Sequence, residues 1–183
     1  MATVEHTESV VGFTQPRDPP PDGVHHAAAR TGNDAVTDEA SAMLAAVLDG
    51  MAERGFGRIV NITSSVVRHP IDVQGLSAAA RAGLHGLVST LVRERIARNV
   101  TINNILPGPF ATDRLISNFT FQAKQKGISP DEALAARRSE LPAKRFGDPM
   151  EVGRLCAYLC STHAGYISGQ SILIDGAAHP QLL

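Results

Sequence analysis

The chain contains no tryptophan, and aromatic residues make up only 4% of its 183 residues. No stretch approaches the roughly 18 consecutive apolar residues that a membrane helix needs. The 17 basic and 18 acidic side chains nearly cancel, giving a net charge of −1, whereas a dominant role at nucleic acids or membrane surfaces usually requires a basic excess. The N-terminal residues also lack the basic start and apolar run of a secretory signal. We therefore expect a cytoplasmic protein that binds neither nucleic acid nor membrane.

Cysteine is scarce as well. Cys156 and Cys160 are the only two, four residues apart in a predicted helix, a spacing that rarely allows a relaxed disulfide. We predict that both are small buried apolar side chains in a reducing compartment. His25 and His26 have no third ligand at helical or strand spacing, so no metal site is predicted.

Length and composition are those of one soluble globular domain. Its 183 residues include 43% hydrophobic and 19% charged residues, which is ordinary for this class. Residues 1–35 are poorly patterned: residues 16–23 (PRDPPPDG) predict a loop, and residues 9–13 could form a short strand before it. We expect the folded domain to cover residues 36–183.

Within residues 36–183, β-branched runs alternate with segments of helical apolar spacing. This alternation predicts an α/β domain with a parallel sheet. The strands are expected at residues 58–63, 101–106 and 171–174, and the two longest helices at residues 37–54 and 77–99.

Several helix ends are marked by capping residues. Thr37 offers an N-cap, and Gly55 suits the exit of the same helix. Ser129 and Asp148 are each followed by proline and, three residues on, by glutamate, which is typical of a capping box with proline at the first helical position.

Four segments in order carry a resemblance to a known family. Together they resemble the second half of a short-chain dehydrogenase/reductase, a family of NAD(P)-dependent carbonyl reductases and alcohol dehydrogenases. Within that family, the sequence is most similar to the 3-oxoacyl-carrier-protein reductase-like branch. The resemblance spans about residue 37 to the C-terminus and implies a partial Rossmann-like, doubly wound parallel sheet flanked by helices. The segments are GRIVNITS (57–64), AGLHGLVSTLVRERIARNVTINNILPG (82–108), RFGDPMEVGRLCAYLCS (145–161) and YISGQSILIDGA (166–177).

The N-terminal half of that family has no counterpart here. The resemblance implies that whole members begin with a strand, a glycine-rich turn and a helix, where close backbone approach and the helix N-terminus hold the pyrophosphate of the cofactor. No G-x-x-x-G-x-G occurs in this chain. If residues 9–13 are the family's fourth strand, the first three strands are missing; alternatively, residues 1–35 are an unrelated tail, disordered by composition. Binding of NAD or NADP is expected to be weak or absent in both cases.

The resemblance also locates the catalytic positions. The family uses a Tyr to transfer the proton, a Lys to lower its pKa and bind ribose, and a Ser to orient the carbonyl. Ser64 aligns with that Ser, but Ser77 stands for the Tyr and Arg81 for the Lys, and Val36 takes the place of a fourth catalytic residue, an Asn. A serine hydroxyl is far less acidic than a phenol of pKa about 10, and arginine is no simple substitute for lysine. The alternative is that Ser77 caps a helix and Arg81 is solvated or ion-paired.

The loop after the strand at 101–106 aligns with the family loop that meets the nicotinamide end of the cofactor. Pro107, Gly108, Phe110 and Thr112 are its candidate cofactor-binding residues, although a turn after a strand would also explain the Pro-Gly pair. His69, five residues past the aligned serine, is the nearest substitute proton donor, but a single histidine in a polar loop is usually just exposed.

Residues 116–141 occupy the place of the family's substrate lid. Phe119 and Phe121 alternate there with polar residues. Mobility of this segment is expected from the resemblance alone.

Two hypotheses of function remain. The first is an oxidoreductase by descent that transfers hydride between NAD(P)H and a small carbonyl substrate and is impaired by its altered active site. The second is a non-catalytic subunit or gene fragment that forms a homo-oligomer, or a hetero-oligomer with a complete homologue, through the helices at 37–54 and 77–99. A serine hydrolase is discounted because the chain has no G-x-S-x-G elbow.

Overall fold

The computed structural model describes residues 7–14, 27–31, 35–71 and 74–180, with side chains from residue 40 onward. The predicted loop at 16–23 and the two adjacent histidines, His25 and His26, lie outside these residues.

A five-stranded sheet in the order β2-β1-β3-β4-β5 forms the centre of the fold. Strands β3 (Gly57–Ile62), β4 (Val100–Pro107) and β5 (Ser171–Ile174) are parallel to one another. The predicted α/β fold with a parallel sheet is confirmed for these three strands. Their predicted bounds are within one residue of the observed ones.

The other two strands are antiparallel. Strand β1 (Thr7–Thr14) contains the strand expected at residues 9–13 and pairs with β3 in the opposite direction. Strand β2 (Ala27–Thr31), which the sequence analysis does not predict, pairs antiparallel with β1 at the edge. The sheet is therefore mixed, whereas a family-type fourth strand would run parallel to β3.

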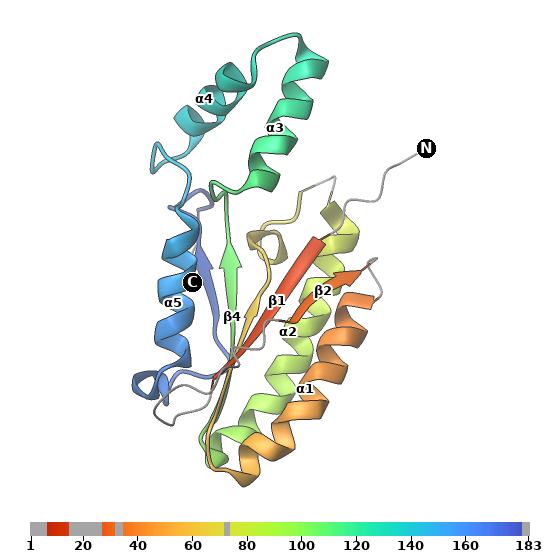
Figure 1. The fold of residues 1–183 in the computed structure, drawn as a ribbon, viewed down its shortest axis with the longest axis vertical. Helices are drawn as coiled ribbons and strands as arrows, with labels where there is room; N and C mark the ends of the chain where they lie inside the picture. Colours follow the sequence, from red (N-terminus) through yellow and green to blue (C-terminus); the bar gives the residue numbers. More distant parts are fainter. Residues whose placement is uncertain (1–6, 15–26, 32–34, 72–73, 181–183) are drawn as a thin grey trace.

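Helices cover both faces of the sheet (Figure 1). On one face, α1 (Ala35–Glu53) and α2 (Gly75–Arg95) lie side by side, and their apolar stripes bury Leu44, Leu48 and Leu84 against Ile59 and Ile102. On the other face, α5 (Pro149–Cys160) packs on the sheet through a second apolar cluster. Short 3₁₀ helices follow β3, α2 and α5: η1 (Ser65–Val67), η3 (Ile96–Arg98) and η4 (Thr162–Ala164).

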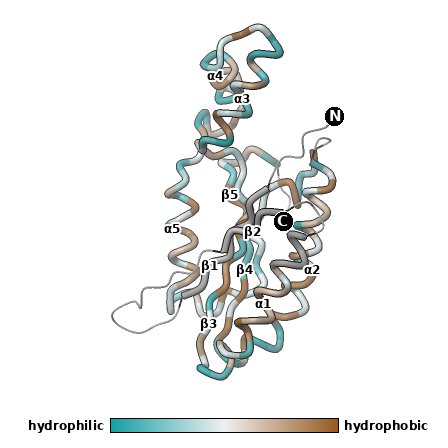
Figure 2. The backbone as a smooth tube through the Cα atoms, turned by 45° about the vertical axis from the view of Figure 1, so that its right-hand side comes forward, coloured by the Kyte–Doolittle hydropathy of each residue, from teal (hydrophilic) through white to brown (hydrophobic). Residues whose placement is uncertain are grey.

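Helices α3 (Asp113–Lys126) and α4 (Pro130–Glu140) form a hairpin beyond the carboxyl ends of the parallel strands. Figure 2 shows this hairpin standing apart from the sheet, with many hydrophilic residues along it. Only a few of its side chains are buried, among them Ala123 and Ala133. The hairpin occupies residues 113–140, close to the predicted lid.

Local capping chemistry explains the helix ends. Ser129 and Asp148 both form the predicted capping boxes, with proline at the start of each helix. Gly55 adopts a left-handed φ of 69° just beyond α1. The prediction for Thr37 is wrong: α1 begins at Ala35, so Thr37 lies inside its first turn.

Neither Cys156 nor Cys160 is in a disulfide; both are half-buried and pack against the apolar cluster beneath α5. A hydrogen bond with Cys160 lowers the pKa of Cys156 to about 7, although burial acts in the opposite direction.

None of the helices in the described part of the chain combines the length and the apolar character needed to cross a membrane.

Candidate functional site

The carboxyl ends of β3, β4 and β5 meet at one edge of the sheet, where open α/β sheets bind ligands. Ser64 follows β3 by two residues and is half-buried. Its Oγ caps η1 by accepting a hydrogen bond from the Val66 N–H at 3.3 Å. Because a hydroxyl that accepts one hydrogen bond can still donate its own hydrogen, Ser64 keeps a donor for a ligand at this edge.

Ser77 and Arg81 lie one turn apart in the first two turns of α2. The Arg81 guanidinium donates from Nη1 to the Ser77 hydroxyl and, at 3.4 Å, to the Ser77 carbonyl. Arg81 is only 5% exposed, and burial, followed by the charge of Arg114, lowers its pKa to about 10. Ser77 does not cap α2, which begins at Gly75, and the alternative of a solvated Arg81 is contradicted by its burial. The other alternative, an ion-paired Arg81, finds no acidic partner among the residues that the structure describes.

The loop after β4 is held against β5. The Gly108 N–H donates to the Ile174 carbonyl at 2.9 Å. Phe110 is buried and forms a parallel bridge with Gly147, so it packs into the protein beneath the site. The Thr112 hydroxyl accepts from the Leu115 N–H at 3.3 Å and caps α3. Of the candidate cofactor residues, Thr112 is therefore already engaged in helix capping, and Phe110 in packing.

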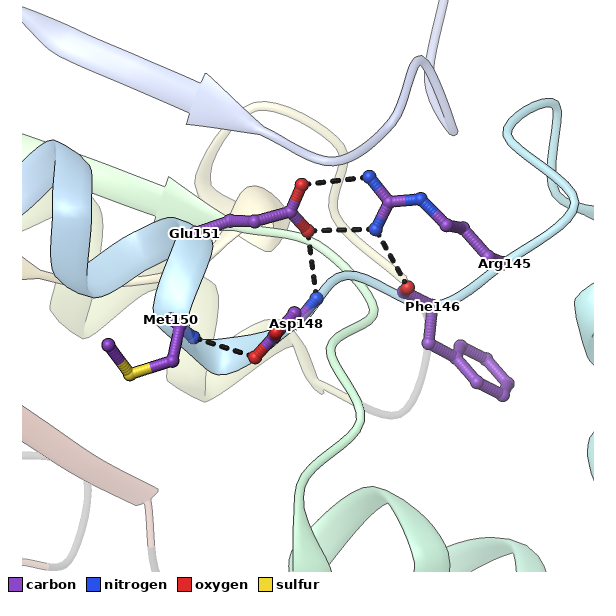
Figure 3. A network of polar contacts seen from close by, with 5 residues as sticks. All are labelled: Arg145, Phe146, Asp148, Met150 and Glu151. Atoms are coloured by element: carbon purple, nitrogen blue, oxygen red, sulfur yellow. Dashed lines mark hydrogen bonds and ion pairs between the residues drawn. The ribbon is translucent and has the colours of Figure 1, made fainter.

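A polar network fixes the segment that faces Phe110 (Figure 3). Arg145 forms a bidentate ion pair with Glu151, with both N–O distances at 2.8 Å. Glu151 also accepts from the Asp148 N–H at 2.8 Å, and Asp148 accepts from the Met150 N–H at 2.9 Å. Gly147 lies between these partners, so the cap of α5 also positions the backbone that bridges to Phe110.

His69, two residues after η1, contacts a small cluster of residues that follows β5. Its ring stacks on His179 with a centroid distance of 4.4 Å and an interplanar angle of 7°. The His179 Nδ1 lies 3.0 Å from the Asp175 Oδ2, which also accepts the His179 backbone N–H, while the Asp175 Oδ1 accepts the Ala177 N–H. His69 is thus half-buried against a second imidazole rather than an exposed loop histidine.

A row of polar side chains crosses the three parallel strands on the face covered by α2. The Asn61 amide donates to Asn104 at 2.9 Å, and the Asn104 amide donates to Ser171 at 3.2 Å. From α2, His85 contacts both the Ser171 and Thr63 hydroxyls at 3.0 Å. Burial, and then the charge of Arg68, lower the pKa of His85, so neutral imidazole is favoured. This row is not among the predictions from the sequence, although three polar residues inside otherwise apolar strands could have indicated it.

An open groove of about 420 Å³ lies along one face of α3. Ile116 and Phe121 are 46% and 64% exposed and form its apolar wall, with Lys124 at its far end. Phe119 instead turns toward Phe146, with ring centroids 6.4 Å apart. Of the two phenylalanines in the lid segment, one is therefore presented to solvent and one is packed.

Ser64 provides a hydroxyl two residues beyond β3, and Ser77 and Arg81 provide a second hydroxyl and a buried guanidinium in the first two turns of α2. Among the residues that the structure describes, no group of three or more His, Cys, Asp or Glu side chains could hold a metal ion.

Comparison with known proteins agrees with this architecture. A family model described as "Enoyl-(Acyl carrier protein) reductase" matches residues 26–179. The chain belongs to the short-chain dehydrogenase/reductase family. Within it, the chain resembles the 3-oxoacyl-carrier-protein reductase branch, as the sequence analysis predicts.

Several curated relatives are named as reductases. The chain is 37% identical over 133 residues to the acetoacetyl-CoA reductase of Cupriavidus necator, covering 73% of this chain and 50% of that protein. It is 35% identical over 134 residues to the 3-oxoacyl-[acyl-carrier-protein] reductase FabG of Vibrio cholerae, covering 73% and 50%. The chain thus spans about half the length of the curated relatives that it matches.

Solved structures of short-chain dehydrogenase/reductases share the fold. The L-sorbose reductase of Gluconobacter frateurii, solved with NADPH and L-sorbose, is 27% identical, with a TM-score of 0.76 over 82% of this chain and 57% of that one. YwfH, an NADPH-dependent reductase involved in bacilysin biosynthesis, is 28% identical, with a TM-score of 0.73 over 80% and 56%.

Proposed function

We propose that this chain is an NAD(P)-dependent oxidoreductase by descent, built to transfer hydride to or from a small carbonyl or alcohol, and that its activity is impaired. The Ser77–Arg81 pair carries this proposal. The phenol that would transfer the proton is replaced by an aliphatic hydroxyl that accepts a hydrogen bond from a buried guanidinium. Such a hydroxyl ionises far less readily than a phenol of pKa about 10, so proton transfer at this position is disfavoured.

The described residues do not fit a whole dinucleotide. In the part of the chain that the structure describes, the position next to β3 is taken by the antiparallel strand β1, and no strand, glycine-rich turn and helix follow one another there. The pyrophosphate of NAD or NADP therefore has no helix N-terminus of the family type to bind. Only the loop at residues 107–112 matches the nicotinamide end, so we propose weak or absent cofactor binding.

The Ser64 hydroxyl would take the family's role of orienting the substrate carbonyl. It lies at the sheet edge with its hydrogen available, which suits orientation of a substrate carbonyl. Any residual activity would therefore depend on Ser64 for positioning.

A fluorescence titration with NADPH tests the cofactor proposal. We expect no saturable binding below millimolar concentration, and tight binding would overturn the proposal of weak or absent cofactor binding.

The catalytic proposal is tested with the double variant Ser77→Tyr/Arg81→Lys assayed with acetoacetyl-CoA and NADPH, with each single variant as control. Activity gained only by the double variant would show that the proton-transfer pair was the missing element. An active wild-type chain would contradict impairment.

A second candidate function is a non-catalytic subunit that pairs through α1 and α2. The outward faces of both helices carry small exposed residues, which allow another helix to approach closely. On α1 these are Ala42, Ala45 and Ala46, and on α2 they are Ala79, Ala82, Gly83 and Gly86. The partner would be a second copy of this chain or a complete homologue. Cys156 and Cys160, which form no disulfide, suit a cytoplasmic, reducing location.

Sedimentation of matched glycine variants tests this second candidate. A Cβ atom at Gly86 or at Gly153 of α5 would meet nothing within 4 Å, so neither Gly86→Arg nor Gly153→Arg should disturb the monomer. We expect Gly86→Arg to halve the sedimenting mass and Gly153→Arg to leave it unchanged. A monomeric wild-type chain, alone and mixed with a complete homologue, would exclude the candidate.

A further inference from the structure

Among the side chains that the structure describes, the arginines Arg58 and Arg81 are buried, and only Arg58 has hydrogen-bond acceptors for its whole guanidinium group. Arg58, 1% exposed, donates to the backbone carbonyls of Gly57, Asn99 and Ser161 at 2.8, 2.7 and 3.1 Å and to the Asn99 side chain at 3.1 Å. Its guanidinium also lies 4.3 Å from the ring centre of Phe56. Arg58 shows how this fold provides acceptors for a buried cation without a carboxylate.

Arg81 is buried nearly as deeply but is poorly supplied with acceptors. Both of its hydrogen bonds run from Nη1 to Ser77, and its Nε–H is buried without a partner. No acidic side chain pairs with it among the residues that the structure describes. Arg114, at the start of α3, adds a second positive charge nearby and disfavours the cation further. A buried cation without a counterion is costly, so this arrangement calls for an anion.

We propose that Arg81 and Ser77 form a binding site for an oxyanion, a carboxylate or phosphate group of a small molecule. The unpartnered Nε–H of Arg81 would donate to one oxygen of the anion. The Ser77 hydroxyl, which accepts from Arg81, still has its own hydrogen to donate to another. Guanidinium groups bind both kinds of oxyanion through charge-assisted hydrogen bonds, which are among the strongest in proteins.

The position of the pair supports a small-molecule ligand. The charge of Arg114, in the first turn of α3, acts on Arg81, and α3 follows the loop by which β4 leaves the sheet at the edge where α/β proteins bind ligands. Ser77 and Arg81 stand where the family has its proton-transferring Tyr and its Lys. In this chain the same positions would bind negative charge instead. The site needs neither hydride transfer nor a dinucleotide, and it stands whether or not the proposed oxidoreductase function holds.

The Nε–H resonances of arginine in ¹⁵N-labelled full-length protein give a direct test. The Arg81 resonance is assigned by its loss in Arg81→Lys, or by through-bond correlation in the wild type if that variant does not fold. Sodium phosphate and sodium acetoacetate are then titrated separately at constant ionic strength set with sodium chloride. We expect a saturable shift of the Arg81 resonance with at least one of the two oxyanions.

The two titrations and the variants separate the outcomes. A shift with phosphate alone indicates a phosphate-bearing ligand, and one with acetoacetate alone indicates a carboxylate-bearing ligand. Ser77→Ala should weaken binding about three- to ten-fold, the effect of one hydrogen bond, whereas Arg93→Lys, an exposed change on the same helix, should leave it unchanged. The proposal fails if the Arg81 resonance does not move with either anion, or if chloride moves it equally.

Discussion

Gly108 and Asp175 lie so close together that a Cβ atom on residue 108 would be 2.5 Å from the Asp175 Cβ and 2.9 Å from its Cα. The neighbouring hydrogen bond, from the Gly108 N–H to the Ile174 carbonyl at 2.9 Å, brings the two backbones together. The loops after β4 and β5 therefore meet backbone to backbone at the candidate site, and only glycine leaves enough room for this contact.

We predict that Gly108→Ala lowers the free energy of unfolding by about 1–3 kcal/mol, because the new methyl group forces one loop away from the other. Urea denaturation measures this change. Gly86→Ala is the matched control: a Cβ there meets nothing within 4 Å, and alanine in a helix is favoured over glycine by up to about 1 kcal/mol. Equal stability of Gly108→Ala and the wild type would show that the loops separate freely.

Replacing the satisfied buried arginine should cost much more than replacing an exposed one. Arg58→Met leaves the carbonyls of Asn99 and Ser161 without their donor, so we expect a loss of about 2–5 kcal/mol in urea unfolding. Arg93→Met, on the exposed side of α2, should change stability by no more than about 0.5 kcal/mol. Similar losses of stability in the two variants would contradict a stabilising role of the Arg58 hydrogen bonds.

The cap of α5 should weaken in acid. The hydrogen bonds from Arg145 and from the Asp148 N–H lower the pKa of Glu151 from an ordinary value of 4.5 to about 2. Because the folded state lowers this pKa, its stabilising effect is complete above pH 4.5 and is lost as the pH falls toward 2. Amide hydrogen exchange at Asp148, whose N–H donates to Glu151, should therefore show progressively lower protection below pH 4.5.

Two substitutions check the origin of that effect. Glu151→Gln should remove the acid dependence of protection at the Asp148 N–H, since the titrating acceptor is gone. Glu140→Gln, which removes an exposed partner of Arg137, should leave it intact. Persistence of the acid effect in Glu151→Gln would assign it to another group.

His85 should make stability depend on pH near neutrality. Burial and the charge of Arg68 lower its pKa from the ordinary 6.5, so a proton binds more tightly in the unfolded state. The contribution is therefore complete above pH 6.5 and lost as the pH falls below it. We expect the melting temperature to drop between pH 7.5 and 5.5, and to drop less in His85→Asn. His163→Asn, a change at an exposed histidine, should follow the wild type.

What the sequence predicts correctly here depends on local chemistry. The caps at Ser129 and Asp148 involve residues three positions apart, so the chain itself brings their partners together. The parallel strands are short β-branched runs between long helices, and their bounds follow from that pattern. Gly55 ends α1 because glycine adopts the left-handed region without a steric penalty.

What it misses depends on contacts between distant segments. The direction of β1 against β3 is set by how residues 7–14 return to the sheet, which no local pattern records. The sequence shows Arg58 as a polar residue at the start of a strand, yet its acceptors other than the Gly57 carbonyl lie 41 and 103 positions away. The burial of Arg81 and the row of Asn61, Asn104 and Ser171 have the same origin. The roles of Ser64, Ser77 and Arg81 remain predictions that the proposed variants would test.

The row of Asn61, Asn104 and Ser171 also bears on how the chain reaches this structure. These residues are direct partners in the pairing of β3, β4 and β5, strands that lie tens of residues apart in sequence. A shift of one residue between any two strands would move an amide or hydroxyl to the opposite face, where it would meet apolar side chains without a partner. Hydrophobic runs alone tolerate such shifts, whereas hydrogen-bonding side chains do not. The row therefore distinguishes the correct alignment from its neighbours during folding, before any ligand is present.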